Sequence, residues 1–327
     1  MIKISDYKLF FSTGKCSYCE NNIVIHRRYS GEKLCPKCFK KNIEKIIYKT
    51  ISKYKMLNRE DKIVVALSGG KDSITLLYNL IKIQKNKHIS EPLVALSIDE
   101  GIKDYRNKSL EIAKKFCREN NIEHKIISFK ERTGYTLDEI VNMKKKTSDA
   151  LYACNYCALL RRRLLNEGAK ELNADVLAIG HNLTDIAETF LMNILFKRIE
   201  LIGNQYIFRK RDELNKYFVK KITPLMRIPE EEIFLYVNLK KLNYYASHCP
   251  YREEDPIIRK RVLEFIQNCK NTSPEIEFNL LNGFLELSEI LYKNQTKKKE
   301  FNICEICGYP SFRSKICSFC RFLKTLK

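Results

Sequence analysis

The sequence lacks any apolar run long enough to cross a membrane. A transmembrane helix needs about 20 predominantly apolar residues, and no stretch of the 327 residues approaches that length. The first residues, MIKISDYKLFFSTGKC, also lack the apolar run of a secretory signal peptide. We therefore expect a cytosolic protein without membrane contact, whose 13 cysteines bind metal or act in catalysis rather than form disulfides.

Acidic residues are scarce relative to basic ones, since 39 Asp and Glu stand against 60 Lys and Arg, a net charge of +21. Residues 1–57 carry 13 basic and 4 acidic side chains, a net of +9, and residues 291–327 carry 9 and 2, a net of +7. These two ends therefore hold +16 of the +21. Such clustering favours a nucleic-acid partner over a generally basic composition.

The Walker A pattern of P-loop proteins is also absent. It requires a glycine five residues before the Gly-Lys pair and Ser or Thr directly after it, but Val65 and Asp72 occupy those positions. The loop that is present, Ser68-Gly69-Gly70-Lys71-Asp72-Ser73, follows an apolar strand pattern at 63–67 and opens a helical pattern at 72–84. This loop belongs to a different kind of ATP chemistry.

The residue types of this loop suit a phosphate group. Glycines let the backbone turn sharply and approach an anion, and free amides at a helix start favour negative charge. Ser68 and Ser73 can donate hydrogen bonds to phosphate oxygens, and Lys71 can neutralise them. Asp72 beside a phosphate is explained if Mg²⁺ bridges the two. We therefore predict a site for ATP and Mg²⁺.

The centre of the chain alternates between strand and helix patterns. Further strands are predicted at 93–98, 125–129 and 175–179, and further helices at 105–120, 156–173 and 184–197. This alternation predicts a parallel sheet with helices on both faces, which binds ligands beyond the carboxyl ends of its strands. At such ends we expect the backbone at Ile98 to meet adenine, Gly180 to permit close approach, and Asp185 to lie near the nucleotide.

Two pairs of Cys-x-x-Cys turns lie at the two ends of the chain. Paired knuckles of this spacing are typical of tetrahedral zinc sites with four thiolates. We predict two structural zinc ribbons, with the ligands Cys16, Cys19, Cys35 and Cys38 in one and Cys304, Cys307, Cys317 and Cys320 in the other.

These motifs come in one order with Cys154-Asn-Tyr-Cys157, the Gly-His-Asn loop at 180–182 and Cys249. That order resembles the tRNA uridine 2-thiolation enzymes of the TtcA/TtuA family, in their archaeal and eukaryotic cytoplasmic branch, which are PP-loop ATP pyrophosphatases. The chain departs from relatives in having Thr184 before Asp185, where they usually have two acids, and Arg161, where some have lysine.

The resemblance implies ATP-dependent replacement of a tRNA uridine C2 oxygen by sulfur, on an α/β PP-loop domain flanked by two zinc ribbons. The predicted domains are 1–57, ribbon and linker helix; 58–255, PP-loop domain; 256–300, helical connector; and 301–327, second ribbon. The predicted ATP contacts are Ala66, Ser68, Gly69, Gly70, Lys71, Asp72, Ser73, Ile98, Gly180 and Asp185. The predicted catalytic residues are Lys71, Asp72, Asp185, Cys154, Cys157 and Cys249. A homodimer is also implied.

Five cysteines lie outside the ribbons. Cys117 and Cys269 are interpreted as small buried side chains, whereas Cys154 and Cys157 open a helix, where thiolates are favoured. The resemblance places Cys249 beside that pair. The trio then holds a [4Fe-4S] cluster with one open iron, or two of the cysteines cycle through a persulfide and a disulfide. The sulfur donor, sulfide or a ubiquitin-like thiocarboxylate carrier, and the target uridine, wobble or T-loop, stay open.

Two basic stretches are candidate RNA contacts. The first is Arg161-Arg162-Arg163, and the second is Arg209-Lys210-Arg211 with Lys220, Lys221, Tyr206, Phe208 and Tyr217. Two other functions compete with thiolation. One is a different PP-loop tRNA enzyme, such as an amidotransferase-type or lysidine-forming ligase, which needs no cysteine trio. The other is a zinc-ribbon RNA-binding protein without catalysis.

Overall fold

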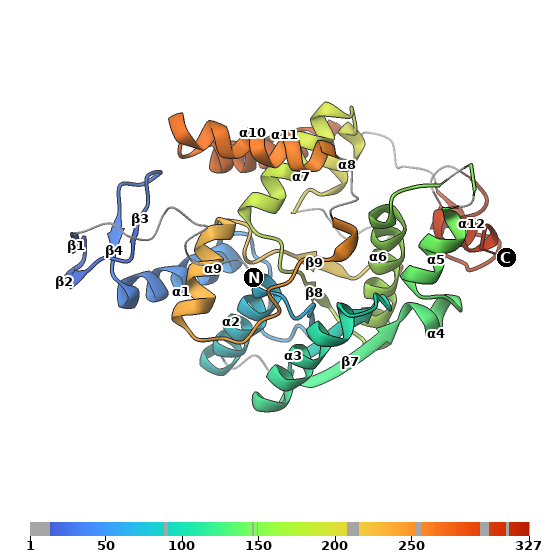
Figure 1. Cartoon of the computed structure of the whole chain (residues 1–327), viewed down its shortest axis with the longest axis horizontal. Coiled ribbons are helices and arrows are strands. Elements are labelled where there is room, and N and C mark those ends of the chain that lie inside the picture. Colours follow the sequence, from blue (N-terminus) through green and yellow to red (C-terminus); the bar gives the residue numbers. More distant parts are fainter. Residues whose placement is uncertain are drawn as a thin grey trace.

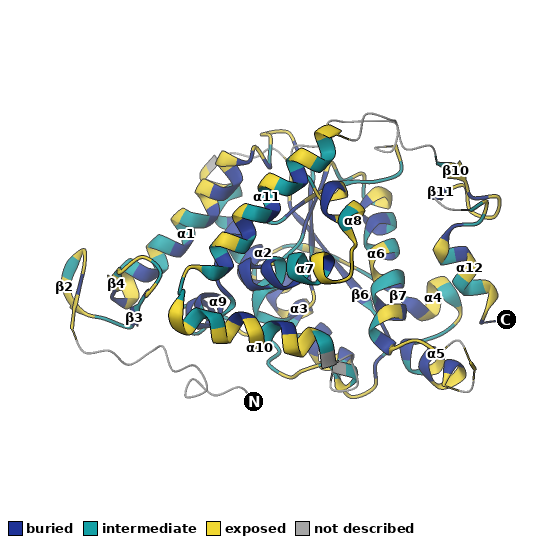
Figure 2. Ribbon diagram, turned by 90° about the horizontal axis from the view of Figure 1, so that it is seen from above, coloured by how far each residue is buried: buried dark blue, intermediate teal, exposed yellow. Residues whose placement is uncertain are grey.

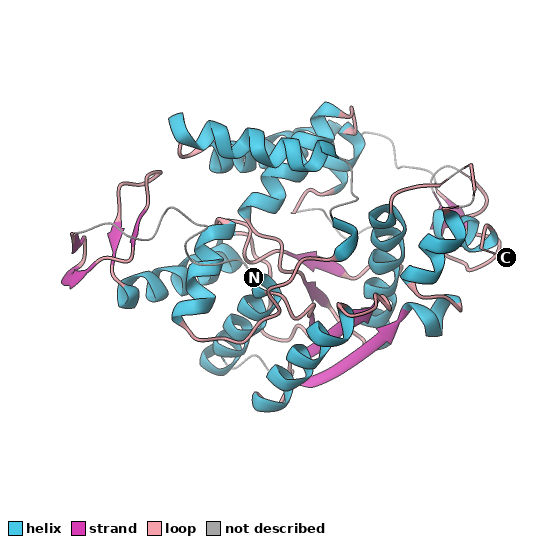
Figure 3. Ribbon diagram, in the orientation of Figure 1, coloured by secondary structure: helices cyan, strands magenta, loops and turns pink. Residues whose placement is uncertain are grey.

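The computed structural model describes residues 14–87, 91–145, 147–148, 150–207, 216–252, 257–294, 301–311 and 314–326. Its centre is a five-stranded sheet in the order β7-β6-β5-β8-β9, in which all neighbours are parallel (Figures 1 and 3). The strands are β5 (Ile63–Ala66), β6 (Val94–Asp99), β7 (Glu123–Ser128), β8 (Val176–Ala178) and β9 (Lys220–Ile222). The predicted α/β fold with a parallel sheet is confirmed.

Alternate residues of β5 serve the two faces of the sheet, as the period of a strand requires. Ile63 and Val65 pack in one apolar cluster with helices α1 (Pro36–Lys53), α2 (Lys71–Lys87), α3 (Arg106–Glu119) and α9 (Glu230–Leu239). Val64 packs in the other with α4 (Phe129–Thr133), α5 (Leu137–Lys144) and α6 (Ala153–Glu171). Helices thus cover both faces, and the phosphate loop lies at the carboxyl edge between them.

A helical layer packs on α7 (Leu183–Leu195), at the top of Figure 1. It consists of α8 (Ile199–Asn204), α10 (Ile257–Thr272) and α11 (Ile276–Asn294), and Figure 2 shows buried and exposed residues alternating along α10 and α11. Leu281 and Phe284 of α11 pack against Leu183. The helical connector predicted for 256–300 is therefore helical over 257–272 and 276–294. None of the helices in the described parts of the chain is long and apolar enough to span a membrane.

Small antiparallel hairpins form the two cysteine-rich ends. The first end contains β1 (Lys15–Cys16), β2 (Cys19–Asn22), β3 (Ile25–His26) and β4 (Lys33–Leu34), and the second contains β10 (Asn302–Ile303), β11 (Pro310–Ser311) and helix α12 (Ser318–Lys324). A short 3-10 helix at Pro250–Arg252 follows Cys249. Figure 1 shows the two ends on opposite sides of the sheet.

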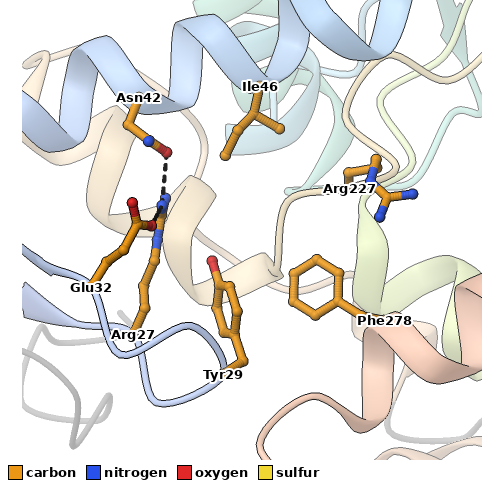
Figure 4. Close-up of a pocket in the computed structure, with 7 residues that line it drawn as sticks. All are labelled: Arg27, Tyr29, Glu32, Asn42, Ile46, Arg227 and Phe278. Carbon is orange, nitrogen blue, oxygen red and sulfur yellow. Dashed lines mark hydrogen bonds and ion pairs between the residues drawn. The ribbon is translucent and has the colours of Figure 1, made fainter. Parts of the chain in front are cut away.

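A buried ion pair fastens the first ribbon to α9. Arg27 lies 2.5 Å from Glu232, and both side chains are 2% exposed. Tyr29 also donates to Glu232 at 2.6 Å. Arg27 and Tyr29 line a cavity of about 250 Å³, together with Glu32, Asn42, Ile46, Arg227 and Phe278 (Figure 4).

Replacement of Glu232 by glutamine is expected to lower the free energy of unfolding by about 1.5–3 kcal/mol, because Arg27 loses its fully buried charged partner but keeps its pair with Glu32 at 3.0 Å. Urea denaturation of the full chain measures this loss. Glu171→Gln is the matched control, since Glu171 pairs with Arg132 on the exposed surface and such pairs contribute about 1 kcal/mol or less. Equal stability of the two variants would contradict the prediction.

Candidate active site

The phosphate loop joins β5 to α2 and has a fixed backbone. Gly69 has a φ of +86°, and a Cβ atom there would lie 2.2 Å from the carbonyl oxygen of Ser109 on α3, so only glycine fits. Ser73 Oγ donates to the carbonyl oxygen of Gly70 at 3.0 Å and accepts from the amide of Ser68 at 3.1 Å. The loop is therefore preorganised around the start of α2.

Lys71 lies between two carboxylates. Its Nζ is 2.7 Å from Glu230 Oε1 and 3.0 Å from Asp72 Oδ2, and its side chain is 16% exposed. Burial disfavours the ammonium, but the charges of Asp72 and Glu230 outweigh it and raise the pKa of Lys71 above its ordinary value. Glu230, at the start of α9, was not predicted from the sequence. The available signal was three consecutive glutamates after Pro229, a pattern of helix starts.

The loop at 180–182 packs against the first residues of α2, next to the phosphate loop. A Cβ at Gly180 would lie 3.2 Å from the backbone of Asp72 and Ser73. Asn182 donates to Asp72 Oδ1 at 3.0 Å and forms a capping box with Asp185 at the start of α7. Burial, and then the negative charge of Asp72, raise the pKa of Asp185 to about 6. Asp72, Asp185 and Glu230 thus gather around the start of α2, with Lys71 between two of them.

The hydroxyl of Thr184 both donates and accepts hydrogen bonds, whereas the carboxylate that relatives usually carry at this position could only accept them. Its hydroxyl donates to Glu277 of α11 at 2.7 Å and accepts from the amide of Glu230 at 3.2 Å. Glu277 is buried, and a carboxylate at position 184 would face it with like charge. Thr184 thus connects the loop at 180–182 to α11 and α9.

The predicted adenine contact lies at the end of β6. The carbonyl oxygen of Ile98 accepts from Arg106 Nε at 2.8 Å, and Ala66 ends the neighbouring strand β5. These positions at the carboxyl edge are compatible with the nucleotide contacts predicted from the sequence, which stay predictions.

Cys154 and Cys157 lie in the first turns of α6, beside the carboxyl edge of the sheet. Cys157 packs in the apolar cluster that Cys249 also contacts. Burial raises the pKa of Cys157 to about 11, although the charge of Arg161 acts in the opposite direction. Among the described residues, the trio does not form as tight a sulfur group as the ribbons do. Ligands of a cluster bind separate irons, so they need not lie as close together as ligands of one ion.

The eight ribbon cysteines come together in the two predicted groups, and within each group the four sulfur atoms lie within 4.8 Å of one another. In each ribbon one thiol also starts a helix, since Cys35 accepts from the amide of Cys38 and Cys317 from that of Cys320. A four-sulfur donor set of this kind fits a tetrahedral metal ion. The prediction of a buried side chain is confirmed for Cys117, but it is wrong for Cys269, which is only partly buried on α10.

The basic candidates divide between buried and open positions. Arg163 lies 3.3 Å from the ring centroid of Tyr309 and 2.5 Å from Glu167, so it joins α6 to the C-terminal ribbon. Tyr217 packs on Tyr309 and Tyr206 on Tyr292. The predicted contacts Phe208, Arg209, Lys210 and Arg211 lie outside the described residues.

Arg162 and Lys221 are exposed, and both are close to His181 at the mouth of the site. Desolvation by the surrounding chain, followed by the charges of Arg162 and Arg259, lowers the pKa of His181 to about 4, although its side chain reaches solvent. A neutral imidazole rimmed by cations therefore lies next to Asp72.

The parallel sheet, the Ser-Gly-Gly-Lys-Asp-Ser loop and the acids around it define a PP-loop protein. In agreement, the family model described as "PP-loop domain" matches residues 38–265, and that described as "2-thiouridine synthetase TtuA, N-terminal LIM domain" matches residues 15–40.

Named relatives extend this assignment. A "Probable sulfurtransferase" of Methanocaldococcus jannaschii is 39% identical, covering 95% of this chain and 88% of the relative. A "tRNA-5-methyluridine(54) 2-sulfurtransferase" of Pyrococcus horikoshii is 33% identical, covering 94% and 93%. The solved "U34-tRNA thiolase NcsA from Methanococcus maripaludis with its [4Fe-4S] cluster" is 33% identical, with a TM-score of 0.79 and 97% of both chains covered. The chain belongs to the family of PP-loop tRNA 2-thiolation proteins, which confirms the resemblance seen in the sequence.

Proposed function

We propose that the protein is an ATP-dependent tRNA 2-thiouridine synthetase. One observation carries this proposal: the phosphate loop and the Cys154–Cys157 pair open at the same carboxyl edge of the sheet, beside the end of β6. An activated uridine held at the loop is then within reach of Cys154, Cys157 and Cys249, which are together called the sulfur centre.

The first step transfers AMP from ATP to the O2 atom of the uridine, and pyrophosphate leaves. Loop amides, Ser68 and Ser73 orient the phosphates, and Lys71 stabilises the charge that develops on the transferred phosphoryl group. Asp72 and Asp185 are suited to Mg²⁺, because their carboxylates lie close together at the phosphate loop and carboxylate oxygens are ligands that this ion prefers.

In the second step, hydrosulfide attacks C2, the C2–O2 bond breaks, and AMP leaves with the former O2 atom. Cys154, Cys157 and Cys249 fit three ligands of a [4Fe-4S] cluster, in keeping with the cluster named for the Methanococcus maripaludis enzyme. Such a cluster would supply an iron with an open position for sulfide. The alternative is a cycle on two of these cysteines. One cysteine takes a persulfide from a sulfane-sulfur donor, the outer sulfur bonds to C2 as AMP leaves, the second cysteine releases it by forming a disulfide, and a thiol reductant then restores both cysteines.

The target base must leave its stack to react, because duplex RNA hides the base edges. Arg162 and Lys221 are exposed near His181 and suit the phosphates of such a displaced nucleotide, whereas Arg259 is paired with Glu188. The sulfur donor is sulfide or a thiocarboxylate carrier protein, and we expect a homodimer.

Mass spectrometry of nucleosides from tRNA treated anaerobically with ATP and sulfide tests the proposal. A 2-thiouridine that depends on ATP is expected, and fragment mapping then assigns it to the wobble position or the T-loop. Activity that survives loss of all three cysteines would instead favour another PP-loop tRNA ligase. Binding of tRNA without pyrophosphate release would favour a protein that only binds RNA.

Zinc is expected in both ribbons at about two ions per chain, because each site offers four thiolates. Cys38→Ser should lower the content to about one, as measured by elemental analysis of purified protein. Cys269→Ser, which alters a cysteine outside both ribbons, is the control and should keep both ions. An unchanged zinc content in Cys38→Ser would contradict the assignment of the first site.

The double variant Arg162→Ala/Lys221→Ala is expected to weaken tRNA binding and to make its salt dependence shallower. Each phosphate contact that is lost should reduce the slope of log K against log salt by about 1. Filter binding over a range of salt concentrations measures this slope. Lys115→Ala removes an exposed charge on α3 and should leave the slope unchanged. Identical slopes in the double variant and the wild type would remove these residues from the RNA interface.

A further inference from the structure

Glu100 is a buried carboxylate between two arginines. It directly follows β6 and is 3% exposed. Its Oε2 atom lies 2.8 Å from Arg106 Nε, and its Oε1 atom accepts from Arg161 Nε at 2.8 Å. Surface pairs exchange freely with water, but a buried carboxylate between two guanidinium groups is held in one geometry.

The two arginines reach different parts of the site. Arg106 Nη1 donates to the carbonyl oxygen of Ser68, the first residue of the phosphate loop, at 2.7 Å. Arg161 Nη2 donates to Cys157 Sγ at 3.1 Å. Three side chains therefore connect the phosphate loop to a thiol of the sulfur centre without a gap.

The backbone on both sides of Glu100 is fixed by packing and by a hydrogen bond. Gly101 has a φ of +69°, and a Cβ there would lie 2.5 Å from Thr136 Cγ2. The carbonyl oxygen of Glu100 accepts from the amide of Leu137 at 2.7 Å, which fixes the turn to the start of α5. The turn that carries Glu100 is therefore held in place on both sides.

A second contact connects the same loop to the third cysteine. The amide of Tyr245 donates to the carbonyl oxygen of Gly69 at 2.8 Å, four residues before Cys249. The ring of Tyr245 packs on Tyr105, beside Arg106, with centroids 5.5 Å apart. Both cysteine-bearing segments are thus fastened to the phosphate loop.

We infer that Glu100 is a positioning residue that couples occupation of the phosphate loop to the geometry of the sulfur centre. ATP at the loop sets the position of the Ser68 carbonyl, and Arg106, Glu100 and Arg161 carry that position to Cys157. Arginine at position 161 suits this role because its planar fork holds a carboxylate and a thiol together, which the single ammonium of lysine does not do. The inference rests on the proposed function, since it needs ATP at the loop and sulfur at Cys157.

The test compares Glu100→Gln, Arg161→Gln and the wild type as full chains purified anaerobically. Arg161→Gln is included in case Glu100→Gln does not fold, because the Arg161 side chain is about half exposed and tolerates substitution better than a buried one. Glu171→Gln is the control for the loss of a surface charge. Pyrophosphate release with tRNA reports the first step, and 2-thiouridine formation reports the second. Visible circular dichroism with and without a non-hydrolysable ATP analogue reports on the sulfur centre. If the chain holds no iron, the alkylation rate of Cys157 replaces the spectrum.

Glu100→Gln is expected to release pyrophosphate within about threefold of the wild-type rate, with an unchanged KM for ATP. Because Arg161 is also a candidate RNA contact, Arg161→Gln is compared at saturating tRNA, where weaker RNA binding does not lower the rate. Thiolation should fall at least tenfold, and the analogue should no longer change the spectrum or the alkylation rate. Glu100→Asp, which keeps the charge, should restore part of the response. A parallel loss of both steps would show a structural role only, and wild-type behaviour in both would remove the coupling; either result overturns the inference. A wild-type chain that releases no pyrophosphate would instead refute the proposed function itself.

Discussion

Replacement of Lys71 by alanine should lower ATP-dependent pyrophosphate release by a factor of about 100 or more. The reason is electrostatic, because a preorganised donor aimed at developing charge typically contributes two to three orders of magnitude in rate. Lys71 is held in place by Asp72 and Glu230 before the nucleotide arrives, so no reorganisation is needed to present its charge. Asp72→Ala should cause a comparable loss, since it removes a predicted Mg²⁺ ligand.

The rate of pyrophosphate release at saturating ATP and tRNA measures this effect. Lys82→Ala is the matched control, because Lys82 lies on the same helix but pairs with Glu44 away from the loop. It should retain the wild-type rate. Both loop variants should keep the far-ultraviolet circular dichroism spectrum of the folded chain. A near-normal rate in folded Lys71→Ala would exclude the loop from the mechanism.

Replacement of Cys249 by serine is expected to abolish thiolation while pyrophosphate release continues. The change removes one of only three proposed ligands of the cluster, and the phosphate loop keeps all its contacts. Anaerobically purified wild-type protein should contain about four iron atoms and four acid-labile sulfides per chain, the complement of one cluster. Both contents should fall sharply in the variant.

Cys269→Ser provides the control for this experiment, because Cys269 lies on α10 and is not a proposed ligand. It should keep iron, sulfide and activity. An iron-free wild-type chain that thiolates tRNA at full rate would rule out the cluster and leave the persulfide route. Loss of pyrophosphate release in Cys249→Ser would show that the variant disturbs the loop as well.

The sequence predicted those parts of the fold that depend on residues close together in the chain. The Ser-Gly-Gly-Lys-Asp-Ser loop, the paired Cys-x-x-Cys turns and the strand before the loop each depend on neighbours in the chain. Strand β9 was missed because it is only three residues long and begins with two exposed lysines. It becomes a strand by pairing with β8, which no pattern within residues 220–222 indicates.

The partners of the site residues could not be read from the sequence, since they come together only in three dimensions. Glu230 is 159 positions from Lys71, and Arg161 is 61 positions from Glu100. Arg163 looked like a candidate for RNA, but the sequence held no sign that Tyr309 would cover it. A charged residue next to a motif is ambiguous until its counter-charge is located.

The attachment of the C-terminal ribbon to α6 has a consequence for how the protein responds to the metals that the cell supplies. Tyr156, Arg163 and Asn166 contact the ribbon along the helix whose first turns carry Cys154 and Cys157. If the ribbon holds the proposed zinc ion, loss of that ion would withdraw support from α6, and the proposed cluster on Cys154 and Cys157 would lose occupancy as well. On the proposed function, zinc starvation should then lower tRNA thiolation even in cells with sufficient iron, with the same outcome as a shortage of iron.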